Sequence, residues 1–226
     1  MATLAQQAHN VLLAKIISCE YAPGASLNEA LLINELGLTR MPLRDALRQL
    51  EVEGLLTIRP KKGIIISEIR AEDISQLSES LIMALSHVMT HYSYLLDKVY
   101  LQDIYHRMEK VWHVDPDAQD LEENMNMVNA LCAELYSYWA SITPNKVIRD
   151  FLAAVLKKKQ RLLNAIGVHF TANYFYNYFQ SPHDTLDVVR ALLDHRIKEA
   201  VEYTSMTLRA ESHCLLMVWI NSRGSK

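Results

Sequence analysis

Apolar and polar positions follow the period of an α-helix in three short stretches at the start of the chain. Apolar residues that recur every three or four positions are typical of amphipathic helices, and they do so in residues 5–18, 27–36 and 39–50. Gly37 can adopt the left-handed conformation that ends a helix, and Thr39 is a residue type that caps the next one. We therefore expect three short consecutive helices, with a tight turn between the second and the third.

A different pattern after Gly54 predicts a β-hairpin. Residues 55–58 and 64–67 are short runs of β-prone residues, and the five-residue segment from Arg59 to Gly63 can form the turn between them. The hairpin follows the third helix directly, as the wing of a winged helix-turn-helix does. Its tip carries Lys61, Lys62 and Gly63.

From Glu72 onward the chain shows helical periodicity and no strand-like alternation. Breaks in this periodicity predict helices over residues 72–95, 98–112, 116–141, 145–166, 170–179 and 184–220. The last of these is expected to be interrupted near Asp194. The predicted fold is therefore mainly α, with a winged helix-turn-helix of three helices and a hairpin in residues 1–69, and an all-helical bundle of six or seven helices in residues 72–226.

The third predicted helix carries arginines on the face opposite to its apolar residues. Arg40, Arg44 and Arg48 are spaced four residues apart, which aligns them along one side of a helix. The second helix of a helix-turn-helix lies in the major groove of DNA with its N-terminal residues at the base edges, and arginine fits O6 and N7 of guanine with two hydrogen bonds. The alternative is that these arginines only solvate an exposed face. Because the helix, turn, helix and basic hairpin occur together, DNA binding is favoured. Lys61, Lys62 and Gly63 at the tip of the hairpin are expected to approach the sugar-phosphate backbone or the minor groove.

Charge and composition favour the same partner and exclude others. The 226 residues carry a net charge of −3, yet residues 36–63 hold six basic and three acidic residues, and such a cluster suits the phosphates of a nucleic acid. Half of the residues are apolar, which is enough for a folded core. The longest apolar run near the end, residues 214–220, is far below the ~20 residues of a membrane span. Three scattered cysteines suit a reducing cytoplasm, so we expect a cytoplasmic protein with no membrane partner.

Four segments of the first domain carry a family resemblance: Ala22–Glu29, Leu36–Leu47, Leu50–Leu55 and Arg59–Gly63. Together they resemble the winged-helix motif of the GntR family of bacterial transcription regulators. The resemblance implies that Arg40, Arg44 and Gly63 contact DNA. Met41 stands where the family usually has threonine, and Asp45 where it usually has glutamate. Because Met41 lies near the base edges in that arrangement, its apolar side chain is expected to alter which operator is recognised.

The helical domain resembles the FCD effector domain of the FadR-like branch of that family in the order of its helices and in the spacing of Ala191 and Ala200. Many FCD domains hold a divalent metal with one aspartate and three histidines, and a bound carboxylate completes the metal's shell. At the four family positions this chain has Cys132, Tyr136, Thr185 and Thr207. Neutral hydroxyls bind Zn²⁺ or Mn²⁺ poorly but hydrogen-bond well to polar organic molecules. We therefore expect an organic effector at these residues, with no metal and no other cofactor.

Other histidines and basic residues have alternative roles. A modest error in register would bring His183 or His213 into the family's metal site. His87 and His91 are spaced as a metal-binding pair on a helix, but no nearby carboxylate or cysteine completes a site, which favours a surface or core-edge pair. The run Lys157–Lys159 is expected to form a solvated helix face.

The sequence as a whole indicates a bacterial transcription regulator and not an enzyme. The predicted protein acts as a homodimer on a two-fold operator in double-stranded DNA, and a small organic effector in the helical domain modulates its affinity for DNA. A second interpretation is a DNA-binding protein whose helical domain only dimerises. A third, a helical enzyme or metalloprotein, has no supporting motif, because the chain lacks a glycine-rich phosphate loop, a Gly-x-Ser-x-Gly elbow and a His-Glu-x-x-His sequence.

Overall fold

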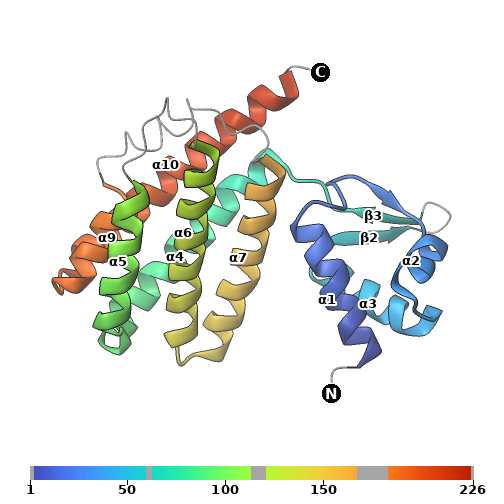
Figure 1. The fold of residues 1–226 in the computed structure, drawn as a ribbon, viewed down its shortest axis with the longest axis horizontal. Coiled ribbons are helices and arrows are strands. Elements are labelled where there is room, and N and C mark those ends of the chain that lie inside the picture. The colour runs from blue at the N-terminus through green and yellow to red at the C-terminus, as the bar shows by residue number, and fades with distance from the viewer. Residues whose placement is uncertain (1–2, 60–62, 113–120, 167–182, 225–226) are drawn as a thin grey trace. The chain divides into compact units, whose positions relative to one another are not determined.

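The computed structural model describes residues 3–59, 63–112, 121–166 and 183–224. These residues are mainly helical, with one small sheet (Figure 1). The chain divides into two compact units, residues 1–70 with 160–167 and residues 71–159 with 168–226. The predicted fold class, a winged helix-turn-helix followed by an all-helical region, is confirmed.

Three helices of the first unit form the helix-turn-helix and its support: α1 (Leu4–Ile17), α2 (Glu29–Leu36) and α3 (Arg40–Val52). The first two begin with capping hydrogen bonds. The side chain of Thr3 accepts a hydrogen bond from the amide of Gln6, and that of Asn28 accepts one from Ala30. These bonds satisfy amides that the first turn of a helix leaves without partners. Thr39 occupies the cap position of α3 as predicted, but its side chain forms no cap hydrogen bond.

The turn between α2 and α3 depends on Gly37. This residue has φ 63° and ψ 30°, the left-handed conformation that its place in the sequence predicts. A side chain at this φ would be strained, whereas glycine adopts it at no steric cost. The amide of Gly37 donates a hydrogen bond to the carbonyl of Ile33, which closes the last turn of α2. The chain can therefore reverse direction within three residues and begin α3 at Arg40.

A three-stranded antiparallel sheet in the order β1-β3-β2 forms the wing, from β1 (Ser26–Leu27), β2 (Leu56–Arg59) and β3 (Gly63–Ile66). The predicted hairpin is confirmed, with both strands displaced by one residue toward the turn because Arg59 and Gly63 pair with each other. The prediction that the second helix starts at Leu27 is wrong. Leu27 pairs with Ile64 in β1, and the helix starts only after Asn28. A two-residue strand is too short to show a period in the sequence.

The core of the first unit fixes which face of α3 points outward. The four apolar residues expected on one face of this helix are buried, and α3 packs against α1 and β2. They are Leu43, Ala46, Leu47 and Leu50. Burying a leucine side chain contributes about 1.5–3 kcal/mol, so this face stabilises one rotation of α3 strongly. Polar residues on the opposite face are held in solvent as a consequence.

Beyond residue 70 the described chain contains only helices: α4 (Ala71–Tyr92), the 3-10 turn η1 (Ser93–Leu95), α5 (Lys98–Trp112), α6 (Leu121–Ile142), α7 (Lys146–Ile166), α9 (Thr185–Leu193) and α10 (Ile197–Gly224). Their bounds follow the predicted ranges closely. The predicted interruption near Asp194 is confirmed, and His195 there has a left-handed φ of 59°. The predicted helix 170–179 lies outside the described residues.

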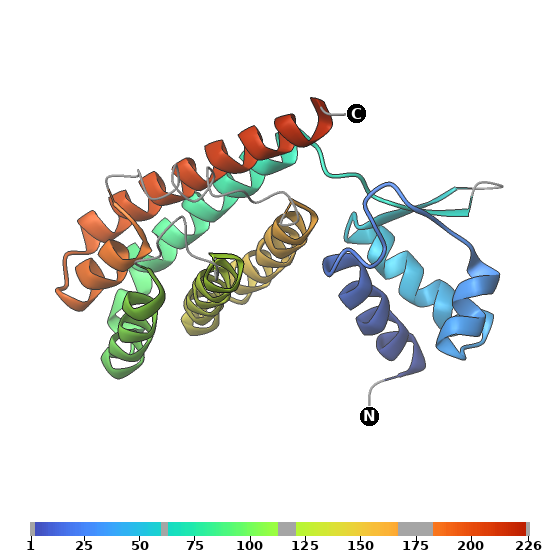
Figure 2. The ribbon, with the colours of Figure 1, turned by 45° about the horizontal axis from the view of Figure 1, so that its top comes forward.

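One apolar core holds the helical unit together. It contains buried residues of α4, α5, α6, α7, α9 and α10, and Trp139 of α6 is its largest fully buried side chain. Figures 1 and 2 both show α10 lying alongside α4. Throughout the described residues, no helix is both long and apolar enough to cross a membrane.

Candidate functional site

The outer face of α3 carries the basic residues that the sequence singled out. Arg40, Arg44 and Arg48 are all exposed, opposite the buried leucines. Met41 is 69% exposed beside them. The structure thus places these four residues on one accessible face of the second helix of the helix-turn-helix, which is the helix that enters the major groove in this motif.

Arg44 forms an ion pair with Glu29, the first residue of α2. The distance from Nε of Arg44 to Oε1 of Glu29 is 2.9 Å, and from Nη2 to Oε2 it is 3.3 Å. This two-bond geometry fixes the orientation of the planar guanidinium. Helical spacing could not predict this pair, because the two residues lie on different helices on either side of the turn.

Packing within the wing explains why residue 63 is a glycine. This residue has φ 82°, and a Cβ atom added to it would lie 2.9 Å from the backbone oxygen of Leu27 in β1. Glycine is therefore required where β3 approaches β1. The contact of Gly63 with DNA stays a prediction. Lys61 and Lys62, predicted to lie at the tip, fall outside the described residues.

In the helical unit, three of the four residues predicted to bind an effector contact one another. The thiol of Cys132 on α6 lies 3.9 Å from Oγ1 of Thr185 on α9, and Tyr136, one helical turn after Cys132, interacts electrostatically with both residues. Burial raises the pKa of Cys132 to about 12 and raises the pKa of Tyr136 well above its ordinary value. Both groups therefore stay neutral and can take part in hydrogen bonds as donors.

Thr207 on α10 reaches this region through the backbone. Its Oγ1 donates a hydrogen bond to the carbonyl of His183, at 3.2 Å, two residues before Thr185. The structure thus brings Cys132, Tyr136 and Thr185 together and places Thr207 against the segment that leads into α9.

A buried ion pair completes this polar cluster and contradicts one sequence prediction. Lys157 and Lys158 are exposed as expected, but Lys159 is buried, and its Nζ lies 2.6 Å from Oε2 of Glu211 on α10. The ammonium also lies 4.9 Å from the ring centre of Tyr136, within the range of a cation–π contact. The prediction of a solvated face for all three lysines is wrong. A signal was available, because Lys159 lies on the same helical stripe as the buried Leu152 and Val155.

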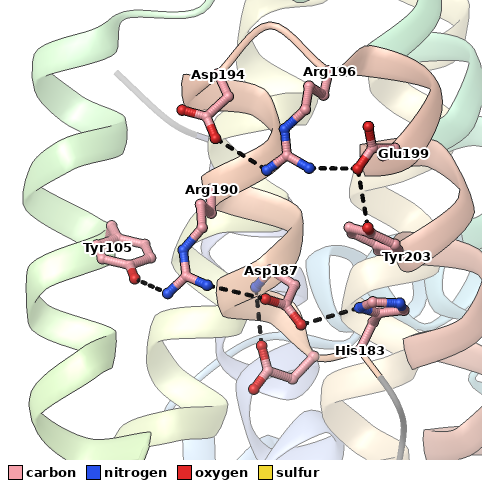
Figure 3. Close-up of polar contacts among 9 residues, drawn as sticks. Tyr105, His183, Asp187, Arg190, Asp194, Arg196, Glu199 and Tyr203 are labelled. Carbon is pink, nitrogen blue, oxygen red and sulfur yellow. Dashed lines mark hydrogen bonds and ion pairs between the residues drawn. The ribbon is translucent and has the colours of Figure 1, made fainter.

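His183 takes part in a network of polar contacts around the start of α9. Figure 3 shows Arg190 between Tyr105 and Asp187, and His183 beside Asp187. The Nδ1 atom of His183 lies 3.2 Å from Oδ2 of Asp187, and its ring stacks on Tyr203 with 3.7 Å between ring centres. His183 is thus engaged with a carboxylate and an aromatic ring.

The side chains at the predicted effector positions do not suit the divalent metal of the resembling domains. A cysteine ligand must lose its proton to bind a metal, and burial raises the pKa of Cys132, which adds to the cost of that step. The ammonium of Lys159 adds a positive charge to the same cluster. No group of three or more histidine, cysteine, aspartate or glutamate residues among those described could hold a metal ion. His87 and His91 lie with their ring centres 4.4 Å apart at exposed positions of α4, and no third metal-binding side chain among the described residues joins them.

A helix-turn-helix with a β-hairpin wing, followed by a helical bundle, defines the class of two-domain winged helix-turn-helix proteins. Residues 4–66 match the family model described as bacterial regulatory proteins, gntR family. This segment is therefore a helix-turn-helix domain of the GntR family.

The curated relatives are similar in sequence to only about a third of this chain. The chain is 34% identical over 71 residues to the uncharacterized HTH-type transcriptional regulator YdhC of Bacillus subtilis (strain 168), covering 31% of this chain and 32% of the relative. It is 34% identical over 64 residues to the HTH-type transcriptional repressor RspR of Escherichia coli (strain K12), 28% of each chain. The chain thus spans about a third of the length of these curated relatives.

A solved structure is similar over almost the whole chain. The crystal structure of a protein described as a GntR transcriptional regulator from Rhodococcus sp. RHA1 matches with a TM-score of 0.71, over 94% of this chain and 97% of that one, at 17% identity. At this identity the likeness concerns the fold alone. The Rhodococcus protein therefore shares the fold of the helical region as well as that of the winged helix.

Proposed function

We propose that the protein is a transcription regulator that binds double-stranded DNA through its winged helix. The observation that carries this proposal is the exposed face of α3, where Arg40, Arg44 and Arg48 lie beside the accessible Met41. Arginine reads guanine edges in the major groove, and a surface with this spacing fits along one groove. The relatives named as transcriptional regulators share this segment, which supports the same function.

The protein acts as a homodimer on a two-fold operator. One helix-turn-helix covers too little DNA for tight, specific binding, and dimers of this motif bind half-sites about one helical turn apart. Selection from a pool of randomised duplex DNA tests the binding function. We expect an inverted repeat to emerge, and a protein that enriches no sequence would contradict the proposal.

The helical domain binds a small organic effector at the cluster of Cys132, Tyr136, Thr185 and Thr207. Burial keeps Cys132 and Tyr136 neutral, and the hydroxyls of Thr185 and Thr207 can both donate and accept hydrogen bonds. Trp139, whose ring centre lies 5.6 Å from that of Tyr136, adds a buried Nε1 without a hydrogen-bond partner in the described structure. A buried donor left unpaired costs about 1–3 kcal/mol, and an acceptor on a ligand would remove that cost.

The buried pair Lys159–Glu211 supports a polar effector that binds without a metal. Its charges offer both a cation and an anion to a ligand that enters the cluster. In the resembling domains a metal supplies the positive charge that holds the effector. Here Lys159 supplies a positive charge in the protein itself. The alternative, a helical domain that only dimerises, predicts that no small molecule stabilises the protein.

A further inference from the structure

Arg44 is the one arginine on the exposed face of α3 with a fixed partner among the described residues. Its guanidinium is held by both carboxylate oxygens of Glu29, at 2.9 and 3.3 Å. Arg40 and Arg48 form no hydrogen bond or ion pair in the described structure. Two of the three arginines are thus free to rotate, whereas Arg44 is oriented before any ligand arrives.

Glu29 occupies only one edge of that guanidinium. Arginine has five N–H donors in a planar fork, and those facing Glu29 are Nε–H and one hydrogen of Nη2. The end of the fork, with one hydrogen on Nη1 and the second on Nη2, remains available. This end forms the two parallel hydrogen bonds by which arginine reads O6 and N7 of guanine. Glu29 can therefore keep its contact while Arg44 binds a base.

Local structure fixes Glu29 at this place. It is the first residue of α2, directly after Asn28, whose Oδ1 caps the helix by accepting from the amide of Ala30 at 2.8 Å. A carboxylate in the first turn of a helix is also favoured by the helix dipole. The side chains of Glu29 and Arg44 are 34% and 54% exposed. The pair therefore lies at the surface, where a ligand can meet the free edge of Arg44.

We infer that Glu29 is a positioning residue for DNA recognition, which holds Arg44 so that its free edge discriminates one base in each half-site. The inference rests on the proposed DNA-binding function. The carboxylate of Glu29 repels phosphates and lowers affinity for DNA of any sequence. Its contribution is therefore to specificity, because an oriented arginine loses less freedom when it binds the right base.

The test compares the full-length wild-type protein with Glu29→Gln, Arg44→Ala and a matched control, Asp45→Asn. Asp45 is exposed on α3 next to Arg44 and has no partner in the described structure. Its replacement removes the same negative charge from the surface without releasing Arg44. Each protein selects sequences from randomised duplex DNA. Two duplexes are then compared by fluorescence anisotropy. One is the sequence that the wild type prefers, and the other differs from it only at the base that Arg44→Ala no longer selects. The ratio of a protein's affinities for these two duplexes measures its discrimination at that base.

We expect Glu29→Gln to lower this ratio about tenfold, which is within the discrimination that one good bidentate contact supplies. The variant should lose its preference at the same base as Arg44→Ala. Both Glu29→Gln and Asp45→Asn should bind non-specific DNA slightly more tightly, but Asp45→Asn should keep the wild-type ratio. An unchanged ratio in Glu29→Gln, with wild-type binding intact, would overturn the inference and leave the proposed function standing. A wild type that selects no sequence would overturn both.

A double variant separates positioning from a general structural effect. If Glu29 acts through Arg44, adding Glu29→Gln to Arg44→Ala should not change the base preference any further. An additional loss of similar size in the double variant would show that Glu29 acts independently of Arg44. Thermal unfolding of all variants checks that the fold is retained.

Discussion

Lys159 and Glu211 form a buried ion pair across two helices of the second unit, with 2.6 Å between Nζ and Oε2 and only 10% and 11% of their side chains exposed. Removing one partner of such a pair leaves a buried charge without compensation, which costs about 3–5 kcal/mol. We expect Lys159→Met to lower the free energy of unfolding by this amount in urea denaturation. Lys157→Met, at an exposed position of the same helix, should change it by less than about 0.5 kcal/mol.

Replacing both partners distinguishes an ion pair from simple packing. The variant Lys159→Met with Glu211→Leu leaves no unpaired charge, so most of the stability should return. If the two single changes add up in the double variant, the residues do not interact in the folded protein.

Arg44 and Lys61 should affect DNA binding in different ways. Arg44→Ala is expected to weaken specific binding by about 1–3 kcal/mol and to relax one base position in each half-site. Lys61→Ala should weaken binding to all sequences alike. It should also reduce the slope of log affinity against log salt concentration by about the amount that one phosphate contact contributes. Anisotropy titrations on specific and scrambled duplexes measure both effects. Wild-type affinity of Arg44→Ala for the specific duplex would contradict the docking of α3 in the groove.

The buried thiol of Cys132 makes stability fall at high pH. Its pKa is raised from 9.0 to about 12 by burial, so the folded state holds a proton that the unfolded state releases. The contribution of this neutral thiol is complete below pH 9 and is lost as the pH rises toward 12, with a slope of at most about 1.4 kcal/mol per pH unit. Cys132→Ser cannot titrate and should flatten the curve between pH 9 and 11. An identical slope in both proteins would show that Cys132 is not buried as described.

An effector should stabilise the protein without added metal. A ligand at a hundredfold excess over its Kd contributes about 2.7 kcal/mol, which a thermal-shift screen of metabolites detects as a higher Tm. Tyr136→Phe should reduce the shift, because it removes one hydroxyl from the cluster, whereas the exposed Tyr94→Phe should not. Chelators should leave the Tm unchanged. A tightly bound metal in the purified protein, with ligands such as His183 or His213, would contradict this prediction.

The helix-turn-helix could be predicted from the sequence because its determinants are local. The apolar spacing of α3 fixes its buried face, and Gly37 fixes the turn before it. Leu27 was misassigned because β1 exists only through pairing with β3, whose partner residue Ile64 lies far along the chain. The assignment of residues 1–69 to DNA binding and of residues 72–226 to effector binding and dimerisation stays a prediction.

The candidate sites were only partly accessible to sequence analysis. Helical spacing shows that Arg44 is on the outer face, but it cannot show that Glu29, fifteen residues earlier, holds the guanidinium. The burial of Lys159 follows from its place on the helical stripe of Leu152 and Val155, but its partner Glu211, 52 residues away, could not be predicted. Charged residues that are buried depend on distant partners, and neither composition nor periodicity reports such pairs.

Salt-dependent binding of a duplex with the selected inverted repeat tests the central claim most directly. A dimer that contacts six or more phosphates should lose affinity by about 10³-fold between roughly 50 and 200 mM salt. It should also bind the repeat far more tightly than a scrambled duplex at every salt concentration, with two chains per duplex. Equal affinity for the two duplexes, or binding that does not depend on salt, would contradict a regulator that reads DNA through α3.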